Sequence, residues 1–533
     1  MFSKKKEKEK LRDNWGKPVP RFRNFDLIKN YYEFLRDNKD FDYVDDRTWN
    51  DLEFDKIFET LDRTVSPVGQ EYFYFLLHKY EPEALKLTQR NELSDYFERE
   101  ESDRLEIQLI LKQLDKTSSH FIPSILFDTT LPYTKHYYIF YLLAFMSFIS
   151  LAMIPFKGIF LFVALGMILI NIIVNKFQSS KIYEHFTGFK GLNDLMITAR
   201  KLSRLKIDIE VIKKIKEKSP LIKLLNKKLG RLVIDKNAIP DMVLVMVEYL
   251  NMLLMFDIIA YYRSVNILKK HRVEIKKIYN FIAELDCAIS LASIKHSNKQ
   301  ICLPEMSSRN EICFRNIYHP LIEEPVKNSI DQLKNSLLVT GSNMAGKTTF
   351  IKTVGVNVIL SQTLGICFAE KLSTYPYKVK SSIRREENPS ESKSYFFVEI
   401  EELNKFINLS QNGNKYLFLI DEIFRGTNTV ERIASSTAVL KYLNHHNLVF
   451  VTTHDIELQY LLKNFSMYHF SEQVENDKFF FDYKIKEGPC TSGNAIKLLE
   501  LMDYPNTITT EASEMAKKLL TTNILDSENL KSL

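Results

Sequence analysis

The sequence predicts an α/β domain whose sheet has a parallel core, joined to an all-α helical domain that carries a hydrophobic helical hairpin. Three short apolar runs after residue 335 alternate with helical patterns, as strands covered on both faces do. Eight of the 15 glycines lie in the last 198 residues, so this part is built differently from the rest. Two uncharged apolar runs lie between residues 137 and 174.

Composition and charge narrow the class of protein. The 533-residue chain is 45% hydrophobic and 26% charged, which excludes wholesale disorder and a fully membrane-embedded transporter. Nine Lys/Arg and three Asp/Glu in residues 1–24 account for the whole net charge of +6, so the chain is not a globally basic DNA-coating protein. Residues 1–40 are interpreted as a basic N-terminal tail, either in contact with anionic lipid or nucleic acid or, as we favour, solvated and flexible.

The five cysteines form no C-x-x-C pair and have no histidine at metal-ligand spacing, which excludes a zinc module and suits a reducing compartment.

The two apolar runs predict a transmembrane hairpin over residues 136–176. Tyr137–Phe156 contains no charge, and Ile159–Val174 follows after a turn of Lys157 and Gly158. A span requires about 20 apolar residues, and runs of this length are rare in soluble cores. The alternative is a helical hairpin buried in a soluble core. Basic flanking residues place both ends in the cytoplasm and predict a membrane-anchored protein with membrane lipid as a partner.

Residues 41–135 and 177–305 have the spacing of amphipathic helices. Phe54, Ile57, Phe58 and Leu61 recur at intervals of three and four, and a second pattern follows Pro67. No catalytic dyad or metal-ligand spacing stands out in these two regions, so by themselves they predict only a helical scaffold.

The residues that carry chemistry begin with a phosphate-binding loop. Thr340 ends an apolar run, and a helical pattern begins at Thr348. The segment between them fits G-x-x-x-x-G-K-[ST], in which main-chain N–H groups and the lysine surround phosphate oxygens and the threonine hydroxyl ligates Mg²⁺. The residues expected to bind nucleotide are Gly341, Ser342, Asn343, Met344, Ala345, Gly346, Lys347, Thr348 and Thr349.

Two further strand ends supply the remaining groups. Asp421 and Glu422 follow the apolar run Tyr416–Ile420, and His454 follows Leu448–Thr452. Ligands of α/β sheets bind beyond the carboxyl ends of the strands. We therefore expect Asp421 to join Thr348 as a Mg²⁺ ligand and Glu422 to activate water, with Lys347 and His454 as further catalytic groups near the phosphates.

In these segments the sequence resembles the ATPase domain of the MutS family. The resemblance rests on the loop TGSNMAGKTT, on DEIFRGTNT from Asp421 and on TTH at 452–454. It implies an ATP hydrolase over residues 306–533 that uses ATP and Mg²⁺, and a homodimer in which Ser394 of one subunit contacts the ATP of the other. It also implies a C-terminal helical dimerisation segment, and a helical core and lever domain that moves with the nucleotide.

Departures from that family affect the expected partners. About 50 residues precede the helical core, too few for the family's mismatch-reading domain. DNA thus stays a candidate partner, in mismatch repair or DNA-structure sensing, whereas mismatch-specific binding is not expected. Ala345 and Phe424 stand where the family commonly has glycines. The alternative is an ATP-binding component of a membrane transport complex, although the Ser-Gly-Gly-Gln type segment of transport ATPases does not occur between residues 349 and 420.

Overall fold

The computed structural model describes residues 2–36, 41–128, 130–229, 249–251, 254–298, 300–342, 345–383, 395–475, 478–490 and 504–521, and residues 243, 246, 496, 499, 500 and 502. The chain divides into two compact units. Unit 1 contains residues 1–40, 61–75 and 90–297, and unit 2 contains residues 41–60, 76–89 and 298–533. The sequence predicts that residues 41–135 belong to the helical core. Two parts of that range, residues 41–60 and 76–89, instead belong to the same unit as the C-terminal part.

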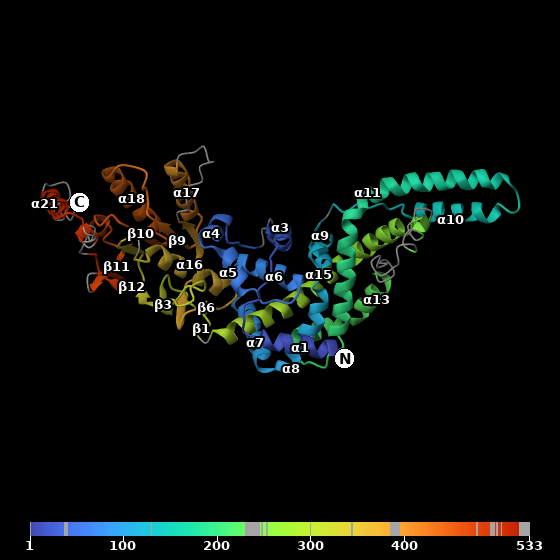
Figure 1. Ribbon diagram of the computed structural model, residues 1–533, viewed down its shortest axis with the longest axis horizontal. Helices are drawn as coiled ribbons and strands as arrows, with labels where there is room; N and C mark the ends of the chain where they lie inside the picture. Colours follow the sequence, from blue (N-terminus) through green and yellow to red (C-terminus); the bar gives the residue numbers. More distant parts are fainter. Residues whose placement is uncertain are drawn as a thin grey trace. The chain divides into compact units, whose positions relative to one another are not determined.

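In the described part of the chain before residue 298, the regular elements longer than a single bridge are helices (Figure 1). They are α1 (Phe2–Asp13), α2 (Phe25–Ile28), α3 (Asn30–Arg36), α4 (Asp46–Asp51), α5 (Phe54–Leu61), α6 (Pro67–His78), α7 (Ala84–Arg99), α8 (Glu101–Leu111), the 3-10 helices η1 (Lys112–Leu114) and η2 (Thr117–Phe121), α9 (Ile122–Phe127), α10 (Tyr138–Met153), α11 (Ile159–Leu202), α12 (Glu210–Glu217), α13 (Ser219–Leu229) and α15 (Phe256–Ser297). The expected helical spacing around Phe54 and after Pro67 corresponds to α5 and α6. Pro67 is the first residue of α6, where its missing N–H costs no hydrogen bond.

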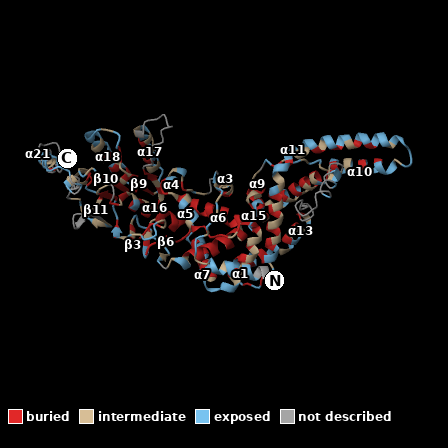
Figure 2. Ribbon diagram, viewed as in Figure 1, coloured by how far each residue is buried: buried red, intermediate tan, exposed pale blue. Residues whose placement is uncertain are grey.

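The predicted hairpin is present as two helices, with bounds that differ from the apolar runs. Helix α10 ends at Met153 rather than Phe156. Ile154 keeps right-handed helical angles, but Pro155 has no N–H to donate to the Leu151 carbonyl. Helix α11 continues past Val174 to Leu202. Among the described helices, α11 alone is both long and apolar enough to cross a membrane, while α10 is a shorter apolar helix. Figure 1 shows α10 beside the first half of α11, and Figure 2 shows that both are largely exposed.

Polar side chains of the hairpin point between its arms. Asn171 is fully buried and its Nδ2 donates to Ser147 Oγ at 2.7 Å, while Ser150 Oγ donates to the Ser147 carbonyl at 2.9 Å. The outer surface is apolar: Phe145, Phe148, Phe162, Leu165, Leu169 and Ile173 each expose 55–73% of their surface. The hairpin is therefore polar inside and apolar outside, the reverse of a helix pair on a soluble surface.

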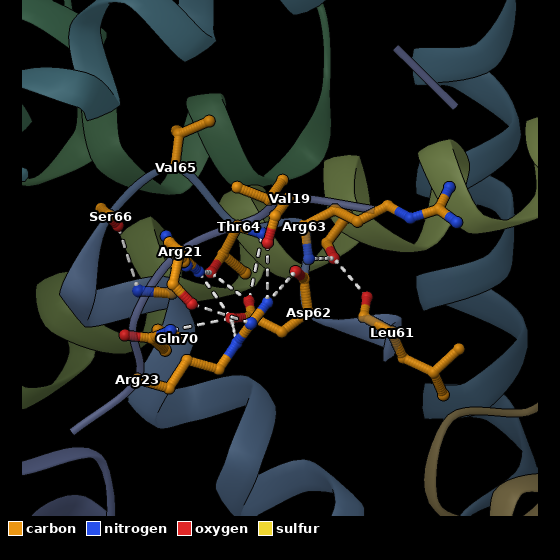
Figure 3. A network of polar contacts seen from close by, with 12 residues as sticks. Val19, Arg21, Arg23, Leu61, Asp62, Arg63, Thr64, Val65, Ser66 and Gln70 are labelled. Carbon is orange, nitrogen blue, oxygen red and sulfur yellow. Dashed lines mark hydrogen bonds and ion pairs between the residues drawn. The ribbon is translucent and has the colours of Figure 1, made fainter. Parts of the chain in front are cut away.

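The basic N-terminal segment is folded onto unit 1. Helix α1 packs against α8, and Arg104 stacks over the Trp15 ring at 3.6 Å. Figure 3 shows Arg21 and Arg23 directed at Asp62. Arg21 Nη2 lies 2.6 Å and Arg23 Nε 3.3 Å from Asp62 Oδ2. The expectation of a solvated, flexible terminus is wrong for these residues.

The described strands of unit 2 form three sheets, of two, six and four strands. They are β1 (Ile301–Cys302), β2 (Glu305–Met306), β3 (Ile312–Ile317), β4 (Asn328–Leu333), β5 (Leu337–Thr340), β6 (Cys367–Phe368), β7 (Lys371–Thr374), β8 (Lys378–Ser382), β9 (Tyr416–Asp421), β10 (Leu448–Thr453), β11 (Ser466–Glu475) and β12 (Lys478–Glu487). The largest sheet has the order β12-β11-β5-β10-β9-β8. Its five strands from β11 to β8 pair in parallel, and β12 adds an antiparallel edge. The three expected strands are the central ones, and all four residues of β5 are buried.

Helices α16 (Lys347–Thr363), α17 (Tyr395–Ser410), α18 (Thr429–Asn444), α19 (Leu458–Leu461) and α21 (Asn506–Thr521) complete the described part of unit 2. Every described residue of α16 from Phe350 to Thr363 except Lys352 is buried. A cluster that includes Leu403, Phe418, Leu440 and Val451 joins α17 and α18 to β9 and β10. These contacts fix the strand ends relative to the start of α16.

Candidate nucleotide site

In the described part of the loop between β5 and α16, two glycines have positive φ angles of the kind that a phosphate-binding loop requires. Gly346 immediately precedes α16 with φ +96°, a left-handed conformation that favours glycine. Gly341 follows β5 with φ +139°, and a Cβ there would lie 2.5 Å from the Phe470 carbonyl oxygen. Both glycines are therefore required by geometry. The loop leads directly into the N-terminus of a 17-residue helix, where unpaired N–H groups favour anions.

Lys347 points back into this loop. Its side chain is buried, and Nζ donates to the carbonyl oxygens of Gly341 and Ser342, each at 2.7 Å. Nζ also lies 3.4 Å from His454 Nε2. The lysine is thus held by two main-chain oxygens of the loop that precedes it.

Thr348 and Asp421 meet as the sequence predicts. Thr348 Oγ1 donates to Asp421 Oδ2 at 2.9 Å, and Thr452 Oγ1 donates to Asp421 Oδ1. Asp421 is the last residue of β9 and is paired in register with Thr452 of β10. A hydroxyl and a carboxylate in direct contact are the oxygen ligands that Mg²⁺ prefers.

Glu422 lies next to these groups in a strained conformation. Its φ is +55°, which is uncommon for a residue other than glycine, and its N–H donates to the Thr452 carbonyl at 3.0 Å. Glu422 Oε1 lies 2.9 Å from His454 Nε2, and Oε2 lies 2.5 Å from Arg425 Nη1. The hydrogen bond with His454 lowers the pKa of Glu422 despite partial burial, and the Arg425 charge adds to this effect. The carboxylate is therefore ionised at neutral pH.

The loop after Glu422 is fastened to α17. Phe424 N donates to Glu399 Oε1 at 2.5 Å, and the rings of Phe424 and Phe396 lie 6.2 Å apart in an edge-to-face arrangement. Gly426 lies against Phe396, where a Cβ would approach the Phe396 Cβ to 2.8 Å. Asn428 then caps α18 by accepting from Glu431 N at 3.0 Å.

The structure thus brings together Lys347, Thr348, Asp421, Glu422 and His454 at the carboxyl ends of β5, β9 and β10. Among the other predicted site residues, Gly341, Ser342, Ala345 and Gly346 form the described part of the loop, and Thr349 is exposed on the first turn of α16. Asn343, Met344 and Ser394 lie outside the described residues.

Sequence reasoning did not assign roles to Thr452, Arg425 and Glu399. The parallel register of β9 and β10 could have indicated Thr452, because it places residue 452 beside Asp421. Tyr483 was also missed: its ring lies 3.2 Å from the position of a Cβ at Gly346, and no local signal in the sequence indicates this.

Chemically, this arrangement places a helix N-terminus, a buried ammonium group, a hydroxyl–carboxylate pair and an ionised glutamate on one edge of a parallel sheet. Such a site belongs to the class of α/β nucleotide-binding domains.

Comparisons with known proteins give matches to one family. Residues 337–520 match the model of MutS domain V, an ATPase-type domain. The DNA mismatch repair protein MutS of Lactobacillus delbrueckii subsp. bulgaricus is 30% identical over 266 residues, which cover 47% of this chain and 31% of that protein. MutS of Listeria innocua is 30% identical over 267 residues, covering 47% and 30%. MutS of Lactobacillus johnsonii is 29% identical over 266 residues, covering 47% and 31%.

Residues 337–520, the domain that begins at β5, are similar to MutS domain V, and the chain is similar to curated MutS proteins over about half of its length. The resemblance stated from the motifs is confirmed at this level. The chain covers about a third of the length of the curated relatives that it matches. The matches do not address the hydrophobic hairpin.

Proposed function

We propose that this protein is a MutS-type ATP hydrolase. The observation that carries the proposal is the convergence of Lys347, the Thr348–Asp421 pair and the Glu422–His454 pair at one edge of the parallel sheet. The match of residues 337–520 to MutS domain V supports it, since that domain is an ATPase-type domain.

The residues present fit ATP and Mg²⁺. Ser342 Oγ is buried without a hydrogen-bond partner among the described residues, so the loop contains an unused polar group. Lys347 Nζ donates to two loop carbonyls and can transfer these hydrogen bonds to β- and γ-phosphate oxygens. Thr348 and Asp421 would hold the metal, which when bound neutralises charge on the phosphates.

Glu422 is the group that we assign to the attacking water. Its carboxylate is ionised, and His454 and Arg425 each contact one of its two oxygens. A fixed carboxylate orients a water molecule and accepts its proton as the oxygen attacks the γ-phosphate. The left-handed backbone of Glu422 sets the direction of this side chain, and strain of this kind is concentrated at functional sites.

A conservative substitution tests this assignment. Glu422→Gln keeps the shape of the side chain and removes the base, so ATP should bind with little change while turnover falls by a factor of ~10² or more. Single-turnover hydrolysis and nucleotide binding would be measured on the same preparation. Hydrolysis at the wild-type rate would contradict the proposed role.

We infer that the active form is a homodimer in which Ser394 of one subunit completes the site of the other, coupled to movement of the helical lever domain. The support is the family resemblance and the fixed contact between α17, which begins after Ser394, and the loop after Glu422. Lys347→Ala and Ser394→Ala should each inactivate the homodimer. A mixture of the two variants contains heterodimers with one intact site. Activity should therefore return on mixing, and each heterodimer should have about half the activity of the wild-type dimer. No recovery on mixing would contradict a shared site.

We also propose that the hairpin anchors the protein in a membrane, with the ATPase domain in the cytoplasm. Its exposed surface is apolar over both α10 and the first half of α11, and large exposed apolar patches mark interaction surfaces. Its polar side chains are paired inside, as helices in lipid require. Lys135 and Lys176 flank the hairpin on the side of the folded domains.

Extraction distinguishes this membrane proposal from a soluble hairpin. The intact protein should stay in the pellet after alkaline carbonate and dissolve in detergent, whereas deletion of residues 136–176 should release a soluble ATPase. Intact protein that is monodisperse in detergent-free buffer would contradict the anchor and leave the ATPase proposal unaffected.

DNA binding is the second candidate function, because the matched relatives are named DNA mismatch repair proteins. It predicts salt-dependent retention of duplex or branched DNA and stimulation of ATP hydrolysis. Absence of retention at low salt would dispose of it. The family match argues against the transport alternative.

A further inference from the structure

Two cysteines that are 65 residues apart in the sequence face each other in unit 2. Cys302 of β1 and Cys367 of β6 are register partners in an antiparallel pair, and their Sγ atoms lie 3.1 Å apart. Directly opposed residues of such a pair have Cα separations of roughly 4.5–5.5 Å, within the range that a disulfide requires. Joining the two sulfurs requires a movement of only about 1 Å, since the bond length is about 2.05 Å.

The two thiols have different surroundings. Cys302 is partly exposed, whereas Cys367 is buried and its Sγ also lies 3.3 Å from the Cys302 carbonyl oxygen. The hydrogen bond from the Cys367 thiol lowers the pKa of Cys302, while the same contact and burial raise the pKa of Cys367. The accessible sulfur is thus the more nucleophilic one, and the buried sulfur retains its proton next to it.

We propose that Cys302 and Cys367 form a redox modification site, in which a peroxide converts the two thiols into an intramolecular disulfide. The Cys302 thiolate attacks one oxygen of the peroxide, the O–O bond breaks, and the second oxygen leaves as water or an alcohol after protonation. The resulting sulfenic acid is then attacked by Cys367 sulfur, which forms the S–S bond, and its hydroxyl leaves as water with the Cys367 proton. Two thiols are oxidised by two electrons and one peroxide is reduced.

The bond would enclose the segment that carries the phosphate-binding loop, whereas Asp421, Glu422 and His454 lie outside this segment. Residues 303–366 contain the loop after β5 and all of α16. Phe368, next to Cys367, donates its N–H to Asn357 Oδ1 of α16 at 2.6 Å, and Asn357 Nδ2 donates to the Tyr318 carbonyl at 3.1 Å. The proposal itself concerns the thiols and does not depend on ATP hydrolysis.

Peptide mapping of the full-length, detergent-solubilised protein tests this inference. The reduced protein would be treated with stepwise amounts of hydrogen peroxide, alkylated, digested with trypsin without reductant and analysed by mass spectrometry. Every cysteine lies in its own tryptic peptide, with Cys302 in residues 300–309 and Cys367 in residues 353–371. We expect these two peptides to become linked, with a mass about 2 Da below their sum. Dithiothreitol should separate them again.

Matched variants identify the order of the steps. In Cys367→Ser, dimedone should label Cys302 as a sulfenic acid, whereas in Cys302→Ser residue 367 should stay a thiol under the same treatment. Cys313→Ser and Cys490→Ser remove the other two partly exposed cysteines and should leave the linkage unchanged. The proposal is overturned if Cys302 and Cys367 are still fully alkylated when Cys313 or Cys490 is oxidised, or if the linkage joins two chains.

Discussion

The buried carboxylate of Asp62 offers the sharpest prediction about stability. Asp62 lies in the connection between α5 and α6, and its side chain is fully buried. It accepts hydrogen bonds from four side chains, those of Arg21, Arg23, Gln70 and Thr64 (Figure 3). The Arg23 side chain is only 6% exposed. Asp62→Ala would leave this guanidinium buried without its counter-charge, which costs roughly 3–5 kcal/mol. Asp62→Asn keeps the shape and one acceptor oxygen, so we expect a smaller loss.

Tryptophan fluorescence can follow unit 1 alone. The chain has two tryptophans, and Trp15 belongs to unit 1 whereas Trp49 belongs to unit 2. In a Trp49→Phe background, denaturant titration of Trp15 fluorescence reports the free energy of unfolding of unit 1. Arg12→Ala is the control, because the Arg12–Glu101 pair is exposed on both sides and should contribute nothing measurable. An equal effect of Asp62→Ala and Arg12→Ala would refute the reasoning.

The pH dependence gives an independent check on Asp62. Burial raises the pKa of Asp62, but the Arg21 charge and hydrogen bonds from Thr64 and Gln70 outweigh it, so the folded-state pKa lies below the ordinary value of 3.8. The stability that this carboxylate contributes is therefore fully present above pH ~4 and is lost as pH falls through the folded-state pKa. The difference between wild type and Asp62→Asn should shrink below pH 4. A constant difference down to pH 3 would contradict this assignment.

Three further predictions concern the candidate site. His454→Ala removes the main cause of the lowered pKa of Glu422, so the acid limb of the pH–rate profile for kcat/KM should move to higher pH; an unmoved limb would contradict the pairing. Thr348→Ala should raise the Mg²⁺ concentration needed for half-maximal hydrolysis by roughly 10-fold, while Thr348→Ser should not, as magnesium titration would measure. Gly426→Ala places a methyl group 2.8 Å from the Phe396 Cβ and should lower activity by displacing α17, whereas Gly166→Ala, with nothing within 4 Å, should have no effect on hydrolysis in detergent.

Much of the candidate site was predictable because a parallel sheet converts local patterns into a spatial cluster. Apolar runs at 337–340, 416–420 and 448–452 indicate buried strands, and strands that run in parallel end on the same edge. Any polar residue that directly follows such a run is then near the others. This argument places Asp421, Glu422 and His454 without any knowledge of the strand order.

The hairpin shows where reasoning from hydrophobicity loses accuracy. Apolar character marks the part of a helix that avoids water, whereas helix ends depend on backbone conformation. Helix α10 therefore stops before the apolar run does, two residues before Pro155, which lacks the N–H that would continue the helix. Helix α11 outlasts its apolar run by 28 residues, because Asn175, Lys176 and the residues that follow are compatible with a helix in water.

Contacts between distant segments were not predictable. Arg21 and Asp62 are 41 residues apart, and Cys302 and Cys367 are 65 apart, with no periodicity or motif that relates one to the other. A basic stretch at a chain end is usually solvated, so only the fold reveals that two of its arginines neutralise a buried carboxylate.

In the loop after Glu422, Phe424 combines a strained backbone with close packing against α17. Phe424 has φ +56°, a conformation that favours glycine, which accounts for the glycine common at this place in the family. A phenylalanine here bears a conformational cost of order 1–3 kcal/mol. Its ring is buried against Phe396 and its N–H donates to Glu399, so contacts with α17 offset that cost. The side chain that replaces glycine therefore couples the loop carrying the proposed base to the helix that begins after Ser394, a link that a glycine could make only through its main chain.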